Sequence, residues 1–348
     1  MLDKKVAIVI LNYKGWLDTI ECLESLFKNK YKNFSLLIVD NYSNDSSVEN
    51  IENWLNGKIE FKINNFLNSY DYSEKYILPI KYAKIKSSNH SGKISFTKDS
   101  SNTNNMYNIF LIEADENYGY SGGNNIGIKY AVENLECEYI WLLNNDTIVS
   151  PDALIQMVEK MNTSINPGVV GSVIKYYNSP DLIEKTCGQG QILTNFIFGK
   201  TLKIMKNNKL DDIMGASFLM SVNTIKKVGY LDEDYFLYRE ESDYCWKVRE
   251  AGLNLICADK STVYHKSAAS SGGKGNARSY YYLSRNTFLF FRKNIKNKFV
   301  RYSFFIIFIL NRIAKIIFLK MQSKNKQAIA VLNGIFDGLK DKRGKGFD

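Results

Sequence analysis

The stretch VAIVILNY, residues 6–13, decides the fold class of this chain of 348 residues. Its six consecutive apolar residues are typical of a strand that is buried on both faces of a sheet. Apolar residues at helical spacing follow between Trp16 and Phe27, and a second apolar run, Leu36 to Val39, comes next. Strand, helix and strand in this order predict crossover connections and a sheet with helices packed against it.

The same alternation continues through the first 277 residues. Ser150-Pro151 predicts the start of a helix that continues through Met157. We therefore predict an α/β domain over residues 1–277, with a Rossmann-like mixed sheet flanked by helices. Further strands are predicted at Ile109–Ile112, Tyr139–Leu143, Val169–Ile174 and Phe218–Val222.

Residues 68–107, approximately, interrupt this rhythm. They are rich in Asn, Ser, Lys and Tyr and show no clear periodicity. We expect the part from Asn68 to Asn105 to be an inserted surface loop that is partly disordered. Two interpretations stay open: a lid that selects the acceptor, or an insertion without chemistry, which we favour.

Charge and cysteine content indicate where the protein works. The net charge of +10 comes from the last part of the chain, because residues 278–348 hold 16 Lys and Arg but 3 Asp and Glu. The five cysteines match neither the spacing of a zinc site nor that of a disulfide framework, which favours a reducing cytosol. The apolar run from Val6 is too short for a signal peptide, so we expect a cytoplasmic protein.

Polar clusters directly follow three of the predicted strands. Ligands of open α/β sheets bind in the crevice at the carboxyl ends of the strands, so these clusters indicate a site. Asp40 suits the N–H and O–H donors of a base or ribose, but a cap of its own turn is comparably plausible. The three clusters are Asn12-Tyr13, Asp40-Asn41 and Asn144-Asn145-Asp146.

Asp146 and His265 are the candidate metal ligands. A hard divalent cation that bridges two phosphates prefers oxygen ligands and needs few of them from the protein. Asp146 follows a strand, and His265 follows the short β-like run Val263-Tyr264. Together they would complete a manganese or magnesium site, although a lone histidine is more often structural.

Three carboxylates, Glu240, Glu241 and Asp243, lie within four residues at the start of an amphipathic stretch. The helix dipole favours acidic residues in the first turn and so explains the presence of any one of them. Three together also offer a general base.

The glycine-rich stretch from Tyr118 to Asn125 opens a further helix, where backbone amides can approach a ligand. Its spacing is not that of a dinucleotide fingerprint, and the sequence contains no Walker A pattern, which disfavours dehydrogenases and nucleoside triphosphatases.

In this order the motifs resemble glycosyltransferase family 2 enzymes of the GT-A fold, particularly the rhamnosyltransferase-like bacterial or archaeal members that build cell-surface polysaccharide. The resemblance covers about residues 5–295, and the ordered set of motifs is far more specific than any single one. It implies an inverting transfer from a nucleoside-diphosphate sugar, dTDP- or UDP-linked with rhamnose as the favoured example, to a glycan or lipid-linked acceptor. The matching segments are residues 9–13, 39–47, 117–127, 142–147, 215–220 and 240–243, and His265.

This resemblance also implies roles for individual residues. Asp40 would contact the nucleotide base, and Asp146 with His265 would hold the divalent metal, Mn or Mg. The second acidic position of the family's Glu-Asp pair falls on Glu241, which we expect to be the general base, with Glu240 and Asp243 positioning or tuning it. The expected donor-binding residues are Asn12, Tyr13, Asp40, Asn41, Asn117, Gly122, Gly123, Asn124 and Asn145.

Residues 278–348 are predicted to form a basic, aromatic helical tail. The apolar run Phe304–Leu310 is followed by Asn311 and Arg312, whereas a membrane span needs about 20 mainly apolar residues. We therefore expect a helix that lies on the cytoplasmic face of the plasma membrane, with its basic residues on anionic lipid. The alternative is packing against the domain or a partner in a homo-oligomer.

Two other functions stay open. A catalytically degenerate scaffold would bind a sugar nucleotide without transferring the sugar. A nucleic-acid-binding protein would use the aromatic residues among the Lys and Arg of the tail. We disfavour a nucleic-acid partner, because it would leave the apolar run Phe304–Leu310 exposed.

Overall fold

The computed structural model describes residues 4–60, 79–90, 93–98, 108–186, 210–266 and 275–347. Within these residues, eleven strands form one mixed sheet in the order β4-β3-β5-β2-β1-β6-β10-β8-β11-β7, with β9 paired to β8. The strands are β1 (Val6–Asn12), β2 (Phe34–Asp40), β3 (Ala83–His90), β4 (Lys93–Lys98), β5 (Ile109–Ala114), β6 (Tyr139–Asn144), β7 (Thr147–Val149), β8 (Pro167–Tyr176), β9 (Ser179–Thr186), β10 (Ser217–Ser221) and β11 (Asn254–His265).

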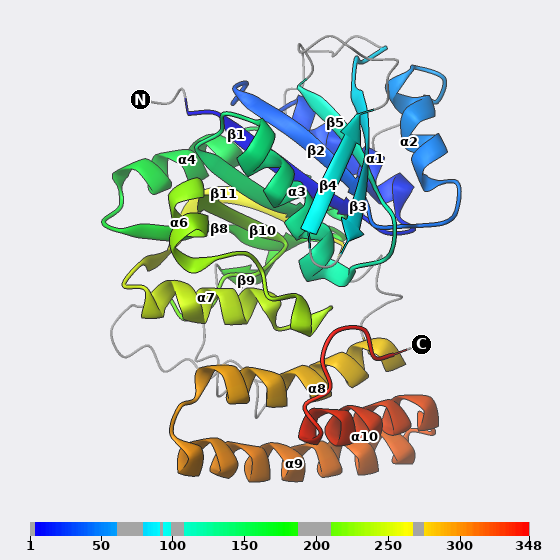
Figure 1. Ribbon diagram of the computed structural model, residues 1–348, viewed down its shortest axis with the longest axis vertical. Coiled ribbons are helices and arrows are strands. Elements are labelled where there is room, and N and C mark those ends of the chain that lie inside the picture. The colour runs from blue at the N-terminus through cyan, green and yellow to red at the C-terminus, as the bar shows by residue number, and fades with distance from the viewer. Residues whose placement is uncertain are drawn as a thin grey trace.

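Helices cover both faces of this sheet, and three further helices form a separate layer below it (Figure 1). A short 3-10 turn, η2 (Glu233–Tyr235), precedes the helix nearest to that layer. The helices are α1 (Trp16–Phe27), α2 (Ser47–Leu55), α3 (Gly119–Asn134), α4 (Ala153–Thr163), α6 (Val222–Val228), α7 (Glu240–Glu250), α8 (Ala277–Asn294), α9 (Lys298–Met321) and α10 (Asn325–Leu339).

β1 lies inside the sheet, parallel to β2 on one side and to β6 on the other. Val6, Ile8 and Ile10 pack in the same core cluster as α1, α2 and α4. Ala7 and Val9 pack in the opposite cluster with α3, α6 and α7, because successive side chains of a strand point to opposite faces. The prediction of an α/β fold with a strand buried on both faces is confirmed.

The other predicted elements are also present, with small differences at their ends. The six predicted strand runs lie in β1, β2, β5, β6, β8 and β10. The helix expected from Ser150-Pro151 begins at Ala153 and continues to Thr163, because Pro151 and Asp152 form a turn ahead of it.

The expectation of a loop over residues 68–107 is wrong for residues 83–90 and 93–98. β3 and β4 form an antiparallel hairpin that extends the sheet beyond β5, with β4 at the edge. Ala83 and Ile85 are buried in the core, whereas Lys84 between them forms ion pairs with Glu52 and Glu113. Because β3 buries only alternate residues, its other side chains are polar, and this hid the period of two. Residues 61–78 and 99–107 lie outside the described residues.

The cysteine interpretation also needs correction. Cys257 is disulfide-bonded, whereas Cys22, Cys137 and Cys245 form no disulfide. Spacing along the chain did not reveal this bond, because folding brings cysteines together that are far apart in sequence.

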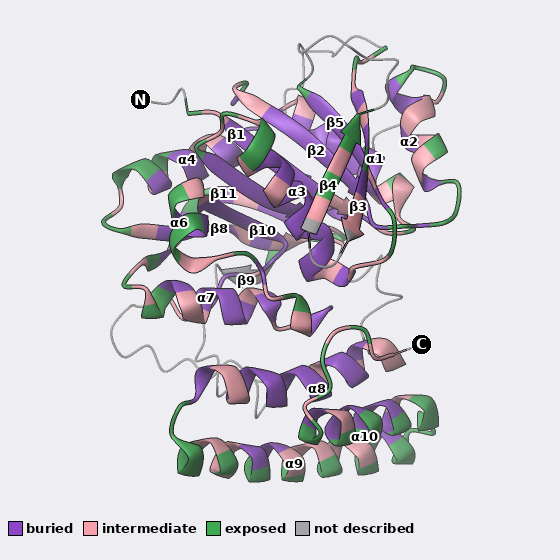
Figure 2. Cartoon of the chain, in the orientation of Figure 1, coloured by how far each residue is buried: buried purple, intermediate pink, exposed green. Residues whose placement is uncertain are grey.

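The predicted helical tail corresponds to α8, α9 and α10, which share one aromatic core. Phe288 and Phe291 of α8 contact Phe305 and Phe308 of α9. α8 is buried along both sides, whereas α9 has an exposed outer face (Figure 2). Within the described part of the chain, no helix combines the length and the apolarity that a membrane span requires.

α8 also joins the tail to the α/β domain. Trp246 of α7 packs edge-on against Phe290 of α8, with 5.7 Å between the ring centroids. Tyr235 of η2 belongs to the same core cluster as the tail helices. The tail therefore packs on the domain through α8, while α9 lies on the far side.

Candidate active site

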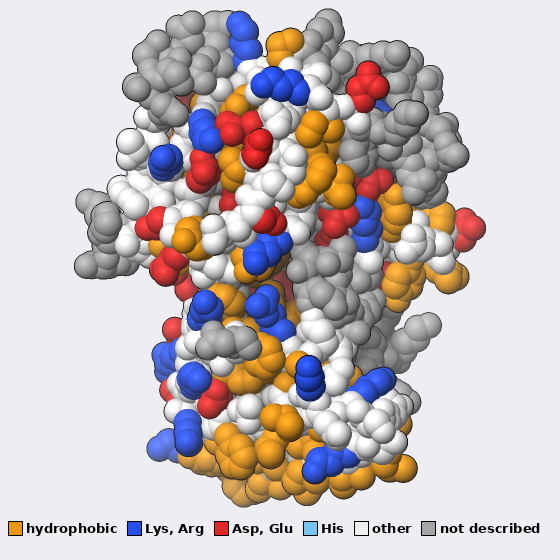
Figure 3. Space-filling model, turned by 90° about the vertical axis from the view of Figure 1, so that its right-hand side faces the viewer, with side chains coloured by type: hydrophobic (Ala, Val, Ile, Leu, Met, Phe, Trp, Pro, Cys, Tyr) orange, Lys and Arg blue, Asp and Glu red, His pale blue; other side chains and the backbone are white. Residues whose placement is uncertain are grey.

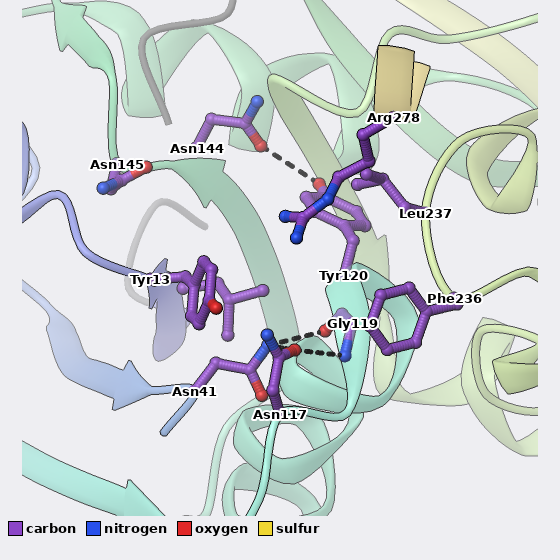
Figure 4. Close-up of a pocket in the computed structure, with 11 residues that line it drawn as sticks. Tyr13, Asn41, Asn117, Gly119, Tyr120, Asn144, Asn145, Phe236, Leu237 and Arg278 are labelled. Carbon is purple, nitrogen blue, oxygen red and sulfur yellow. Dashed lines mark hydrogen bonds between the residues drawn. The ribbon is translucent and has the colours of Figure 1, made fainter. Parts of the chain in front are cut away.

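Two cavities open where β1, β2 and β6 end. The inner cavity is shown in Figure 4, and it shares Tyr13, Asn117, Phe236 and Arg278 with the outer cavity, so the two form one continuous cleft. The inner cavity is also lined by Leu11, Asn41, Gly119, Tyr120, Asn144, Asn145 and Leu237, and the outer cavity by Lys14, Tyr42, Ser43, Asn44, Lys345 and Phe347.

Four of the predicted donor-binding residues line the inner cavity: Tyr13, Asn41, Asn117 and Asn145. Asn41 Nδ2 donates to Asn117 Oδ1 at 3.1 Å and to the carbonyl of Gly119 at 2.9 Å. Asn145 Nδ2 donates to Thr19 Oγ1 at 3.1 Å, which fixes this side chain against α1. Hydrogen bonds between the strand ends therefore hold the polar wall of the cavity in place.

Asn12 and Asp40 lie behind this wall and bond to each other. Asn12 Nδ2 donates to Asp40 Oδ1 at 2.6 Å. Asp40 also accepts hydrogen bonds from the amide and the hydroxyl of Ser43, a residue that lines the outer cavity. Asp40 thus caps its own turn, one of the two roles left open, and its contact with a base stays a prediction.

Gly122, Gly123 and Asn124 lie in the first turns of α3 and are not among the residues that line the cleft. A Cβ atom at Gly123 would come within 2.5 Å of Leu11 Cδ1, and one at Gly122 within 2.6 Å of Tyr118 Cβ. The structure therefore uses these glycines for close packing of the helix. Asn124 Nδ2 donates to the carbonyl of Tyr120 and so supports the neighbouring wall.

Asp146 and His265 face each other, as the metal prediction requires. The antiparallel pairing of β7 with β11 sets Thr147 opposite His265, and the Asp146 Oδ1 to His265 Nε2 distance is 3.4 Å. Glu184 Oε2 lies 3.0 Å from the other ring nitrogen, Nδ1. Burial alone lowers the pKa of His265, but the hydrogen bonds with Asp146 and Glu184 outweigh burial and raise it to about 9.

This arrangement fits a divalent cation. A carboxylate on the second ring nitrogen, here Glu184, is the usual partner that orients a metal-binding histidine. Among the described residues, no cluster of three His, Cys, Asp or Glu side chains is able to hold a metal. Asp146 and His265 would therefore be the two protein ligands, and substrate oxygens would complete the coordination.

Glu240 and Glu241 at the start of α7 and Asp146 after β6 all lie near Tyr120. The pKa of Tyr120 is raised well above its usual value, first by burial and then by Glu240, Glu241 and Asp146. Tyr120 lines the inner cavity, and its hydroxyl lies 3.1 Å from Asn144 Oδ1 and 3.0 Å from the carbonyl of Gly215. The charges of Asp146 and of the acidic pair therefore both act on the Tyr120 hydroxyl.

The two glutamates of the pair differ in environment. Glu240 is 3% exposed, and burial, followed by the charge of Glu241, raises its pKa well above the usual range. Its Oε2 atom has no hydrogen-bond partner within the described residues. Glu241 is only partly buried. Burial and the neighbouring charge therefore favour the protonated form of Glu240, while Glu241 is the more accessible carboxylate of the pair.

Asp243 has a structural position. It is fully buried and accepts hydrogen bonds from Tyr235 Oη at 2.9 Å and from Asn294 Nδ2 at 2.7 Å. Lys247 Nζ lies 2.6 Å from its other oxygen. Asp243 thus ties α7 to η2 and α8, which agrees with a positioning role.

The loop between η2 and α7 is strained, and α8 holds it. Phe236, Tyr238 and Arg239 have φ values of 62°, 67° and 84°, a region that non-glycine residues rarely adopt. Asn286 Nδ2 lies within 2.9 Å of the carbonyl oxygens of Tyr235, Leu237 and Tyr238. Because this loop leads directly into Glu240, Asn286 helps to set the position of the acidic pair.

Seven residues of the inner cavity were not predicted as site residues, and Leu11 and Gly119 are two of them. Tyr120 lies within the glycine-rich motif and Asn144 within a strand-end cluster, so the sequence did contain a signal for these two. Phe236 and Leu237 come from the strained loop, and Arg278 extends from the start of α8 toward the space between Tyr13 and Tyr120 (Figure 4). No motif marked these three.

Known proteins resemble the chain both in sequence and in structure. The sequence model described as glycosyl transferase family 2 matches residues 6–67 and 96–229, which is more than half of the chain. A low-salt glycan biosynthesis hexosyltransferase, Agl10 of Haloferax volcanii, is 22% identical over 239 residues, covering 68% of this chain and 78% of the relative. The rhamnosyltransferase WbbL of Escherichia coli K12 is 24% identical over 153 residues, covering 40% and 57%.

Two solved structures share the fold. The mannosyltransferase PcManGT from Pyrobaculum calidifontis, in complex with GDP-Man and Mn²⁺, aligns over 97% of this chain and 88% of its own, with a TM-score of 0.56 and 11% identity. TarS 1–349 of S. aureus, in complex with UDP-GlcNAc, aligns over 97% and 81%, with a TM-score of 0.55 and 12% identity. At such identities the likeness shows the fold, which is the predicted GT-A fold.

Proposed function

This chain belongs to glycosyl transferase family 2, and on that premise we propose that it transfers a hexose from a nucleoside-diphosphate sugar to a glycan or lipid-linked acceptor. One observation carries the proposal: Asp146 and the pair Glu240 and Glu241 all act on Tyr120 in the wall of the inner cavity. The candidate metal ligand and the candidate base therefore lie around the same residue of the cavity wall.

We place the donor along the continuous cleft. Tyr42, Ser43 and Asn44 line the outer cavity and suit a nucleoside, whereas Asn144 and Asn145 line the inner cavity and suit sugar hydroxyls. Arg278 lines both cavities and would lie beside the diphosphate between them. A divalent ion held by Asp146 and His265 would supply positive charge to the departing diphosphate.

Inverting transfer then needs a base on the acceptor side. Glu241 would take the proton of the acceptor hydroxyl as its oxygen attacks the anomeric carbon and the carbon–phosphate oxygen bond breaks. The pKa of Glu240 is raised, first by burial and then by Glu241, so Glu241 is the member of the pair that we assign as base. The Tyr120 hydroxyl, which bonds to Asn144 and to the carbonyl of Gly215, forms part of the cavity wall.

The relatives support a hexose donor. Those similar in sequence are named a hexosyltransferase and a rhamnosyltransferase, and those similar in structure were solved with GDP-Man and Mn²⁺ or with UDP-GlcNAc. A dTDP- or UDP-linked sugar, rhamnose included, and a manganese or magnesium ion remain our proposal.

A donor panel tests this function. UDP-, dTDP- and GDP-linked hexoses would be incubated with the protein, with Mn²⁺, Mg²⁺ or a chelator, and release of the nucleoside diphosphate would be measured. We expect one donor to be consumed in the presence of metal. If every donor binds but none is consumed with any acceptor, the protein is a sugar-nucleotide-binding scaffold.

The strained loop offers a test of how the acidic pair is positioned. Asn286→Ala removes the donor that the carbonyl groups of Leu237 and Tyr238 share, while Tyr235 keeps its bond from Arg285, so we expect the free energy of unfolding to fall by about 1–3 kcal/mol. Because a shift of about 1 Å can cost about a hundredfold in rate, kcat should fall at least tenfold. Ser303→Ala, which removes a bond within α9, is the control. An unchanged kcat in the folded Asn286 variant would contradict the positioning role.

We also propose that the tail lies on an anionic membrane surface. Apolar side chains gather at the lower end of the molecule, where α9 and α10 lie (Figure 3). The exposed cations Lys298, Lys320, Lys324 and Lys326 come from the same two helices and the turns at their ends. An apolar face with a basic rim is typical of helices that lie in the membrane interface. The exposed apolar residues include Phe299, Ile306, Leu310, Ile317, Met321, Ile329 and Phe336. A location on the cytoplasmic face of the plasma membrane stays a prediction.

Vesicle sedimentation tests this surface. Wild type should bind vesicles that contain phosphatidylglycerol, and less so at high salt, because salt screens the lysines. Ile306→Glu and Met321→Glu, at positions 61% and 80% exposed, should each weaken binding about tenfold. Ile165→Glu, at a position 81% exposed on the α/β domain, should have no effect. If wild type forms a dimer that does not bind vesicles, and both variants are monomeric, this face is instead a homo-oligomer interface.

A further inference from the structure

The segment after α10, residues 340–347, turns back toward the α/β domain. In Figure 1 it leaves the end of α10 and passes over α8 toward the start of that helix. Lys345 and Phe347 thereby line the outer cavity together with Lys14 and Ser43, which lie more than 300 positions earlier in the sequence. The wall of the outer cavity thus combines the two ends of the described chain.

Hydrogen bonds hold this segment in place. The amide of Gly344 donates to the carbonyl of Asp234 at 2.7 Å, and its carbonyl accepts a 2.5 Å bond from Nη1 of the fully buried Arg285. The amide of Gly346 donates to Tyr282 Oη at 3.2 Å. Arg285 Nη2 also donates to the carbonyl of Tyr235, so one guanidinium joins the segment to the strained loop.

Close packing fixes the segment as well. Phe347 packs on Tyr281 of α8, with 5.3 Å between the ring centroids. Gly346 lies so close to Tyr281 Oη and Arg285 Nη1 that a Cβ atom would overlap both. The segment is therefore a built part of the fold, and it delivers two side chains, those of Lys345 and Phe347, to the cleft.

The charges around the outer cavity indicate an anionic ligand. Lys14, Arg278 and Lys345 line it, and none of its lining residues is Asp or Glu. Three cations without a carboxylate are suited to the two or three negative charges of a diphosphate. The neighbouring Tyr42 and Phe347 offer aromatic surface to the nucleoside.

We propose that residues 343–347 form a strap that completes the donor site, and that Lys345 binds the diphosphate of the donor. This inference rests on the proposed function and deepens it, because it assigns a donor-binding residue to a part of the chain that lies beyond the segments matched by the family. Lys345 contributes to binding in the ground state and the transition state alike, so its loss should raise the donor KM and leave kcat nearly unchanged.

Calorimetric titrations of the full chain, with Mn²⁺ present throughout, test the strap. UDP, dTDP and GDP are titrated one at a time, and the matching uncharged nucleoside is titrated separately at high concentration. We expect Lys345→Ala to raise the Kd for the bound nucleoside diphosphate about tenfold, and Lys345→Arg to keep it within about twofold. Lys340→Ala removes an exposed lysine from the same segment outside the cavity and should have no effect. Affinity for the uncharged nucleoside should be the same in all variants.

A second variant separates the strap from the single charge. Gly346→Ala should displace the strap and weaken nucleoside-diphosphate binding as much as Lys345→Ala does, with thermal unfolding as the check on folding. If wild type binds a nucleoside diphosphate and Lys345→Ala binds it equally well, the strap proposal is wrong while the proposed function stands. If wild type binds none of the three, both are wrong.

Discussion

Glu241→Gln is expected to lower kcat by about a hundredfold to ten-thousandfold, because the amide cannot accept the proton of the acceptor hydroxyl. The donor affinity should stay close to that of wild type, since the diphosphate site at Asp146 and Arg278 is untouched. Steady-state transfer assays and calorimetric titration of the donor would measure the two effects separately.

Glu240→Gln is the matched control in the neighbouring position. Burial and the charge of Glu241 raise the pKa of Glu240 and favour its protonated form, which glutamine matches in charge and nearly in shape. We expect kcat to stay within about tenfold of wild type. The reverse pattern, with a large loss in Glu240→Gln and a small one in Glu241→Gln, would assign the base to Glu240.

Asp146→Asn should lower kcat/KM by about a hundredfold to a thousandfold and remove most of the response to added Mn²⁺. The amide oxygen is a neutral and weaker ligand, and the paired His265 loses the charge that it faces at 3.4 Å.

Glu184→Gln should have a smaller effect on kcat/KM, because it alters only the group that orients His265. We expect the metal affinity of this variant to fall about 10–100-fold.

The metal affinity of these variants is best measured by Mn²⁺ titration in the presence of a nucleoside diphosphate, which supplies the remaining ligands. Asp152→Asn, in an exposed ion pair with Lys30 on the same domain, is the control and should bind metal as wild type does. If wild type transfers the sugar equally fast with a chelator and with Mn²⁺ while Asp146→Asn is inactive, Asp146 has a role that does not involve a metal.

Much of the fold was predictable because its signal is local. The run Val6 to Leu11 alternates between two core clusters, so burial on both faces selects an unbroken apolar sequence. Asp146 and His265 were predicted for a related reason, since each follows a strand, and β7 and β11 pair at that point. The same reasoning failed for β3, which buries only alternate residues, Ala83 and Ile85 among them.

The sequence by itself determined the α/β class and the family, because both are encoded in local patterns of neighbouring residues. It also predicted the acidic pair and the metal candidates, and their roles stay predictions. Only the tertiary structure decided which side chains share the cleft. It packed Gly123 against Leu11 of the sheet and Gly122 against Tyr118, used Asn12 and Asp40 to support the wall, and brought Arg278 and Lys345 from the tail. The physical reason is that long-range contacts, such as those that Arg285 makes with Tyr235 and Gly344, have no period or spacing along the chain.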